Sequence, residues 1–120
     1  MNDFKKLTVW TKSIQFVKDV YLLTKKFPKE ELFALTQQIR RATISIPSNI
    51  AEGSGRNSET DYMRFIDIAN GSAFEVETQL ILAFELSYIT KEEFEKIYYD
   101  LMEIEKMLYA LRRSKQNPTT

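Results

Sequence analysis

The chain has 120 residues, of which 43% are hydrophobic, with no cysteine, no histidine and 17 basic against 17 acidic residues. This length and apolar fraction suit one compact domain with its own core. Without cysteine there is no disulfide, thiolate nucleophile or thiolate zinc site, and without histidine the commonest proton shuttle and metal ligand are missing. The composition therefore argues against most enzymes, and we expect a protein that is not a catalyst and has no cofactor.

The charges are unevenly distributed along the chain. Residues 1–57 contain ten Lys or Arg and five Asp or Glu, so this part carries +5 and the remainder carries −5. A basic part favours contact with a nucleic acid, whereas opposite halves also attract each other or a neighbouring subunit. The net charge of zero favours the second explanation, because nucleic-acid-binding domains are typically basic as a whole.

The chain contains no long apolar run. Its longest, Leu80 to Phe84, is followed by Glu85, so we expect no membrane span and a cytoplasmic location. One domain is expected over residues 1–113. The C-terminal segment 114–120, which contains Pro118, is predicted to be disordered.

Apolar residues at steps of three and four predict a helix over residues 8–27 and a second over about 30–54. The first helix has two adjacent apolar stripes, one with Trp10, Ile14, Val17 and Tyr21 and one with Phe16, Val20, Leu23 and Phe27, so we expect it to be buried on two sides. Pro47 lies inside the second helix, where we expect a kink, with a full break as the weaker alternative. Gly53 or Gly55 can end that helix in a left-handed conformation.

The third helix is predicted to begin after the N-cap Ser58 and to end near Ser87, and the fourth begins with the capping box Thr90 to Glu93. Four helices with short connections predict an all-α fold, an antiparallel up-down four-helix bundle. Gly71 lies inside the third helix, although glycine there costs about 1 kcal/mol relative to alanine. We expect a helix of the same bundle or of a neighbouring subunit to pack closely against it.

A polar stripe lies beside the apolar stripe on both the second and the third helix, and together the two stripes form what we call the polar seam. Its members are Gln38, Arg41, Ser45, Asn49, Glu52, Arg64, Ser72, Glu75 and Gln79. Two antiparallel helices rise equally per residue in opposite directions. The residue numbers of two residues at the same height, one from each helix, therefore always add up to nearly the same value. This register predicts the pairs Arg56/Asp61, Glu52/Arg64, Ser45/Ser72, Arg41/Glu75 and Gln38/Gln79.

Two explanations of the polar seam remain open. It consists of ion pairs that fix the register of the helices, or it is open to a groove where Arg41, Asn49 and Arg56 hold a phosphate or carboxylate. A separate group of carboxylates on the fourth helix invites comparison with a magnesium site, but its wide angular spread favours solvated surface. This group comprises Glu92, Glu93, Glu95, Asp100, Glu103 and Glu105. No metal ligand is assigned.

Three segments carry a family resemblance: residues 4–10 (FKKLTVW), residues 37–56 with the string SIPSNIAEGSGR, and residues 68–72 (IANGS). With these segments the chain, from Phe4 to about Leu111, resembles the four-helix-bundle proteins encoded in intervening sequences of bacterial 23S ribosomal RNA genes. The resemblance implies an up-down bundle that often forms a ring-shaped homopentamer. The family is similar to the accessory proteins of diversity-generating retroelements, which bind nucleic acid and reverse transcriptase. Those relatives are strongly basic, whereas this chain is neutral.

The leading functional hypothesis is a non-catalytic, self-assembling bundle that acts as a scaffold or adaptor and contacts ribosomal or other structured RNA, or a ribonucleoprotein. The candidate phosphate contacts are Lys5, Lys6, Lys12, Arg40, Arg56, Arg112 and Arg113. The alternative is a pure protein-interaction module without nucleic-acid binding. A magnesium-dependent all-α nucleotide hydrolase is the third hypothesis.

Overall fold

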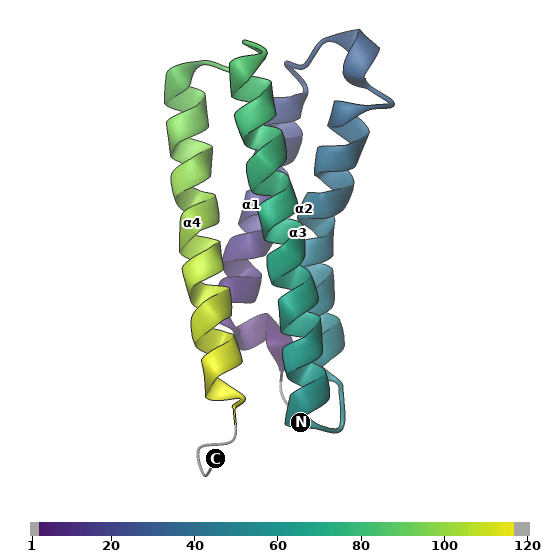
Figure 1. Cartoon of the computed structure of the whole chain (residues 1–120), viewed down its shortest axis with the longest axis vertical. Helices are drawn as coiled ribbons and strands as arrows, with labels where there is room; N and C mark the ends of the chain where they lie inside the picture. The colour runs from purple at the N-terminus through teal and green to yellow at the C-terminus, as the bar shows by residue number, and fades with distance from the viewer. Residues whose placement is uncertain (1–2, 117–120) are drawn as a thin grey trace.

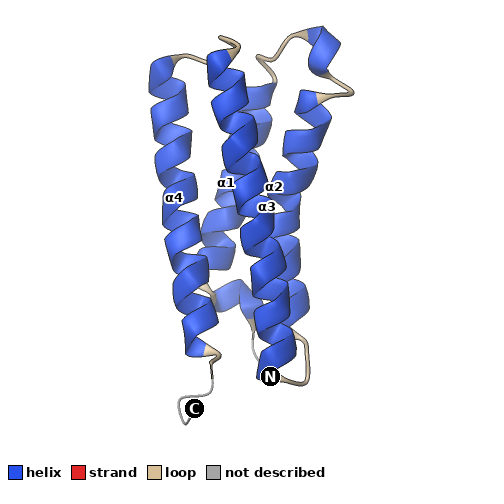
Figure 2. Ribbon diagram, in the orientation of Figure 1, coloured by secondary structure: helices blue, strands red, loops and turns tan. Residues whose placement is uncertain are grey.

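The computed structural model describes residues 3–116, which form helices and loops without a strand (Figure 2). Four α-helices, α1 (Thr8–Thr24), α2 (Leu35–Ser54), α3 (Glu59–Glu85) and α4 (Lys91–Ser114), are joined by short loops, and two short 3-10 helices, η1 (Phe4–Lys6) and η2 (Lys29–Glu31), precede α1 and α2. The four long helices lie side by side along the longest dimension of the molecule (Figure 1). The predicted all-α fold with four helices is confirmed.

Contacts between neighbouring helices show how they are oriented. Asp67, near the start of α3, pairs with Arg112, near the end of α4, at 2.6 Å. At the other end of these helices, the rings of Phe84 and Phe94 stack with their centroids 4.8 Å apart. The helices α3 and α4 therefore run in opposite directions. Contacts join α1 to α2, α2 to α3, α3 to α4 and α4 to α1, which fixes the order of the helices around the bundle.

The predicted caps of the last two helices are present. The Ser58 hydroxyl accepts from the backbone N–H of Asp61 at 3.0 Å, and Thr90 and Glu93 form the complete capping box at the start of α4. At the end of α3, the backbone N–H groups of Ser87 and Tyr88 donate to the carbonyls of Phe84 and Ala83, which is the Schellman arrangement. Ser87 has the left-handed φ of 64° that this arrangement requires.

The second helix begins later than its sequence predicts. Residues 29–31 form η2, and α2 starts only at Leu35, because Ala34 has non-helical torsion angles and the Glu31 carboxylate accepts from the Leu35 N–H at 3.2 Å. The helix continues through the buried Pro47, so the weaker alternative of a full break is wrong, and the kink stays a prediction. It ends at Gly55 with φ −92°. No described glycine has a positive φ, so the predicted left-handed stop is wrong.

The core lies along the axis of the bundle. The helices α2, α3 and α4 supply most of its fully buried side chains, including Ile39, Ile46, Ile50, Ile66, Val76, Leu80, Leu101, Ile104 and Leu108. On α1, the core receives Phe16 and Val20, whereas Ile14 is 36% exposed and Val17 and Tyr21 are only partly covered. The prediction that α1 is buried on two sides is therefore wrong.

The C-terminal boundary also differs from the prediction. Ser114 is the last residue of α4, and the Lys115 ammonium lies 3.8 Å from the Glu59 carboxylate and 4.8 Å from the ring centre of Tyr62. Lys115 therefore lies against the start of α3, where an ion pair and an aromatic ring hold it. The rest of the predicted disordered segment, residues 117–120, lies outside the described residues.

Candidate functional site

The polar seam between α2 and α3 forms at two of its predicted levels. The Ser72 hydroxyl donates to the Ser45 hydroxyl oxygen at 2.9 Å, and Arg56 lies 3.8 Å from the Asp61 carboxylate. The Asn49 amide donates at 2.8 Å to both the carbonyl and the hydroxyl of Ser45, which orients that hydroxyl. The pairing of residues at the same height on the two helices therefore predicted the correct register for these contacts.

The other seam pairs do not form as predicted. Arg41 donates to Gln38 of its own helix at 2.8 Å instead of meeting Glu75, and Arg64 pairs with Asp61 at 3.1 Å instead of Glu52. These residues are exposed. A pair with a partner three or four positions away on the same helix restricts the long side chains less than a pair across the seam, so it has a lower entropic cost. The prediction of Arg41/Glu75 and Glu52/Arg64 ion pairs is therefore wrong.

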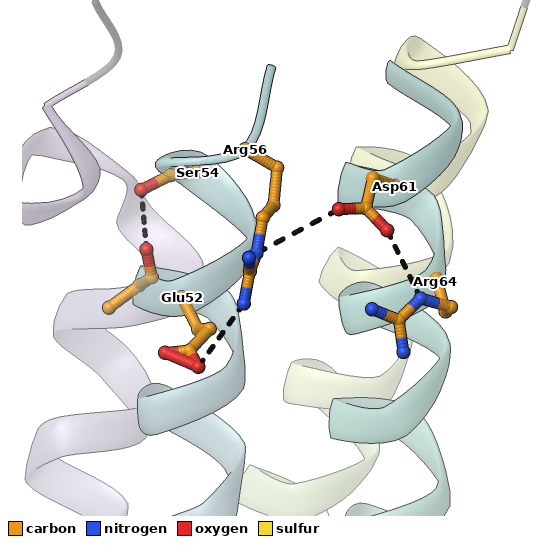
Figure 3. Close-up of polar contacts among 6 residues, drawn as sticks. Glu52, Ser54, Arg56, Asp61 and Arg64 are labelled. Carbon is orange, nitrogen blue, oxygen red and sulfur yellow. Dashed lines mark hydrogen bonds and ion pairs between the residues drawn. The ribbon is translucent and has the colours of Figure 1, made fainter. Parts of the chain in front are cut away.

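At the bottom of the bundle, Arg56 joins the end of α2 to the start of α3 (Figure 3). Its guanidinium lies 3.5 Å from Glu52 and 3.8 Å from Asp61, with the Phe65 ring centre 4.5 Å away. Ser54, also drawn in Figure 3, donates to the Ala51 carbonyl at 2.8 Å. Through its contacts with Asp61 and Phe65, Arg56 holds the end of α2 against the start of α3.

The upper end of the seam has an unsatisfied group. Gln79 is only 8% exposed, and its amide nitrogen donates weakly to Glu75 at 3.4 Å. Its amide oxygen is buried and has no hydrogen-bond partner among the described residues. The predicted partner Gln38 accepts from Arg41 instead, so the Gln38/Gln79 pair is also corrected.

The seven candidate phosphate contacts separate into two groups. Arg40 donates to the Thr24 hydroxyl at 2.8 Å and lies over the Tyr21 ring, and Arg112 makes two hydrogen bonds to Asp67. Together with Arg56, these arginines have partners inside the bundle. The remaining four, Lys5, Lys6, Lys12 and Arg113, form no side-chain ion pair within residues 3–116.

The glycine that permits close packing is Gly53, not Gly71. A Cβ at Gly53 would lie 2.8 Å from the Phe65 Cβ and 3.1 Å from the Tyr62 ring, whereas one at Gly71 would meet nothing within 4 Å. Gly71 is exposed on α3. The predicted approach of a helix from the same bundle is therefore wrong, and approach of a neighbouring subunit stays a prediction.

Two grooves lie on opposite sides of the bundle. The first, between α1 and α2, is lined by Val17, Lys18, Tyr21, Leu22, Lys25 and Ile44. The second, between α3 and α4, is lined by Asn70, Phe74, Met102, Glu105, Lys106 and Tyr109. Several apolar side chains in the two grooves, including Leu22, Phe74 and Tyr109, are more than half exposed. Both grooves were missed from the sequence, because most of their apolar side chains, including Leu22, Ile44 and Phe74, lie outside the predicted apolar stripes.

The described residues offer little for catalysis by a metal. Within residues 3–116, no three acidic side chains come together in a way that could hold a metal ion. The acidic residues of α4 instead pair locally, as in Lys96 with Asp100 and Lys106 with Glu103. None of the described helices has an apolar stretch long enough to span a bilayer.

A comparison with protein families matches residues 5–110 to the family described as 23S rRNA-intervening sequence protein. The chain belongs to this family. Among solved structures, the chain is similar to a Bacteroides thetaiotaomicron protein of unknown function from the S23 ribosomal protein family. The two are 31% identical with a TM-score of 0.80, over 88% of this chain and 99% of that one. Among curated proteins, no significant match was found.

Family membership agrees with the segments that carry the resemblance. The matched region includes the string from Ser45 to Arg56, whose residues supply the α2 side of the polar seam and the α2–α3 turn. In this chain those residues hold helices together: Ser45 bonds to Ser72, and Arg56 closes the turn.

Proposed function

We propose that this family member is a self-assembling scaffold or adaptor without catalytic activity, built as an antiparallel up-down bundle that works in the cytoplasm. The observation that carries the proposal is the exposure of large apolar side chains in two grooves on opposite sides of one protomer. Contiguous exposed apolar surface on a small protein typically marks a binding face. A second copy of the chain is the partner proposed for these faces.

The charges on the two sides support a second copy as the partner. The helices α1 and α2 together carry four basic and two acidic residues, whereas α3 and α4 together carry six basic and twelve acidic residues. Lys18 and Lys25 border the α1–α2 groove, and Glu75 and Glu85 are exposed on α3. A contact between the α1–α2 side of one copy and the α3–α4 side of the next therefore brings opposite charges together.

A contact between two different faces has a consequence for the size of the assembly. Such a head-to-tail interface leaves one face of each kind free at every step, so it closes into a ring or continues as a filament. The homopentamer implied by the family resemblance is the ring we propose. The absence of a side chain at the exposed Gly71 lets a second copy approach the α3 backbone.

The test is the mass of the purified protein in solution. Light scattering at about 0.1 M salt should give one species of about five times the mass of a protomer, 14.1 kDa, and raising the salt to about 1 M should weaken it because screening removes the charge attraction. A monomer at all protein concentrations and at low salt would reject self-assembly.

A second candidate function is contact with structured RNA. The observation favouring it is that the start of α1 and the end of α4 lie at the same end of the bundle (Figure 1). The exposed Lys5, Lys6 and Arg113 are at that end, without an ion pair among the described residues. An assembled ring would repeat this basic end once per protomer, so weak contacts would add.

We expect the affinity for a labelled ribosomal RNA fragment to fall steeply with salt, by a slope of about 0.7–0.9 per phosphate contact on logarithmic axes. The double variant Lys5→Ala/Lys6→Ala should reduce both the affinity and this slope. The control is Lys96→Ala, which removes a lysine that already pairs with Asp100 on α4 and lines neither groove. No binding at low salt would leave the protein-interaction module without nucleic acid.

A further inference from the structure

A pair of glutamates crosses the contact between α3 and α4. Glu77 on α3 accepts a hydrogen bond from the Tyr98 hydroxyl of α4 at 2.8 Å. Glu105, about two turns further along α4, interacts with the same Glu77 carboxylate through its side chain. The Oε2 atom of Glu105 is buried, with no hydrogen-bond donor for it among the described residues.

Two ionised carboxylates are not a stable arrangement in this position. Neighbouring like charges repel, and a buried acceptor without a donor loses its hydration without compensation. A single proton removes both problems, because a protonated Glu105 donates to Glu77 and no longer needs a donor of its own. Burial, followed by the hydrogen bond and the charge of Glu77, raises the pKa of Glu105 to about 8.

We propose that Glu105 and Glu77 share one proton, and that losing this proton loosens α3 from α4. The pair is thus a pH-sensitive latch between the two helices. In its closed form the Glu105 hydroxyl donates to Glu77, which also accepts from Tyr98, so the three side chains form one hydrogen-bonded chain. In its open form the added negative charge lies beside Glu77 and drives the helices apart.

The surrounding groups give the latch no counter-charge. Glu77 is the group that raises the pKa of Glu105 from across the helix contact, and no group of α1 or α2 within the described residues contributes. Lys106 and Tyr109 line the same groove, but the Lys106 ammonium is directed to Glu103 at 3.7 Å. The charge of Glu77 also raises the pKa of Tyr98, after their hydrogen bond and burial.

The direction of the pH effect follows from the raised pKa. A glutamate in the unfolded chain has a pKa of about 4.3. Between that pH and about 8, the folded protein therefore holds one more proton at Glu105 than the unfolded chain does. The contribution of this proton to stability is complete below about pH 4 and is lost progressively as the pH rises through 8.

The first measurement is direct titration of the carboxyl groups by carbon NMR on protein labelled at glutamate side chains. One resonance should titrate near pH 8 in the wild type and be missing in Glu105→Gln, which keeps the shape and a donor toward Glu77. The control Glu95→Gln, at an exposed position of the same helix, should leave that resonance in place. If every glutamate of the wild type titrates below pH 6, the latch is rejected.

The second measurement is the melting temperature between pH 5 and 9.5. The wild type and Glu95→Gln should lose roughly 5 °C or more relative to Glu105→Gln over this range. Parallel profiles for the three proteins would overturn the proposal. In Glu77→Gln, Glu105 faces a neutral partner, so its titration should move down by about one pH unit or more. An unchanged midpoint in that variant would show that the proton is not shared.

Glu105 also lines the groove proposed as an assembly face, and this step rests on the proposed function. Assembly measured by light scattering should be weaker at pH 9 than at pH 6.5 in the wild type but equal at both in Glu105→Gln. If the protein is a monomer at every pH while the NMR resonance still titrates near 8, self-assembly fails and the latch stands. If assembly occurs and no such resonance is found, the latch fails alone.

Discussion

Gly53→Ala should lower the free energy of unfolding by about 1–2 kcal/mol, whereas Gly71→Ala should raise it by about 0.5–1 kcal/mol. Both substitutions add one methyl group inside a helix and gain the same intrinsic helix propensity. At Gly53 the new Cβ would lie 2.8 Å from the Cβ of Phe65, an atom held close to the α3 backbone, so α2 and α3 must separate. At Gly71 the new Cβ meets nothing within 4 Å.

Urea unfolding followed by circular dichroism gives both free energies, at several protein concentrations so that association is separated from folding. Gly71→Ala is the matched control for Gly53→Ala, because it reports the propensity term without a clash. Equal effects at the two positions would contradict the close approach of α2 and α3 at Gly53. A loss of assembly in Gly71→Ala with unchanged folding is the result expected from the subunit contact proposed at Gly71, and it is independent of the contact at Gly53.

The two glycines show why packing was misassigned from the sequence. A glycine inside a helix indicates that something approaches it, and the small residues Ala69, Ser72 and Ala73 around Gly71 favour that position in the sequence. Gly53 was assigned to the helix end, because glycine is common there. Which face of a helix meets its neighbour at a single residue depends on where the turn begins, and the α2–α3 turn was not predictable to that accuracy.

Local sequence signals and helical periodicity did predict most of the fold. The caps at Ser58 and Thr90 depend on hydrogen bonds within four residues, so the sequence contains all of the information. The register that brings Ser45 to Ser72 follows from the equal rise of two antiparallel helices. Ion-pair partners were less predictable, because an exposed arginine such as Arg41 or Arg64 chooses among several acceptors of similar energy.

The grooves were not predictable for a different reason. On α1, two adjacent apolar stripes have the same spacing, and only the positions of α2 and α4 decide that Phe16 is buried while Ile14 is exposed. The acid pair of Glu77 and Glu105 was missed as well. Its members are 28 positions apart and lie on α3 and α4. The polar stripes in the sequence predict a register for α2 against α3, but none for α3 against α4.

Ile44→Glu should convert the assembled protein to a monomer, weakening association by about 100-fold or more. Ile44 is 41% exposed and lines the α1–α2 groove, so the substitution puts a charge in the apolar part of the proposed contact. The cost combines the lost apolar burial, the desolvation of a carboxylate and its repulsion from the acidic α3 side of the next copy. Each tenfold loss corresponds to about 1.4 kcal/mol.

The matched control is Ile68→Glu, because Ile68 is also an isoleucine on a helix and is also 41% exposed, but lines neither groove. Both variants should keep the helical content and the melting behaviour of a folded bundle, since neither side chain belongs to the buried core. Sedimentation velocity at matched concentrations separates the cases. If Ile44→Glu stays assembled while Ile68→Glu becomes a monomer, the α1–α2 groove is not an assembly face and the interface lies on the surface of α3 around Ile68.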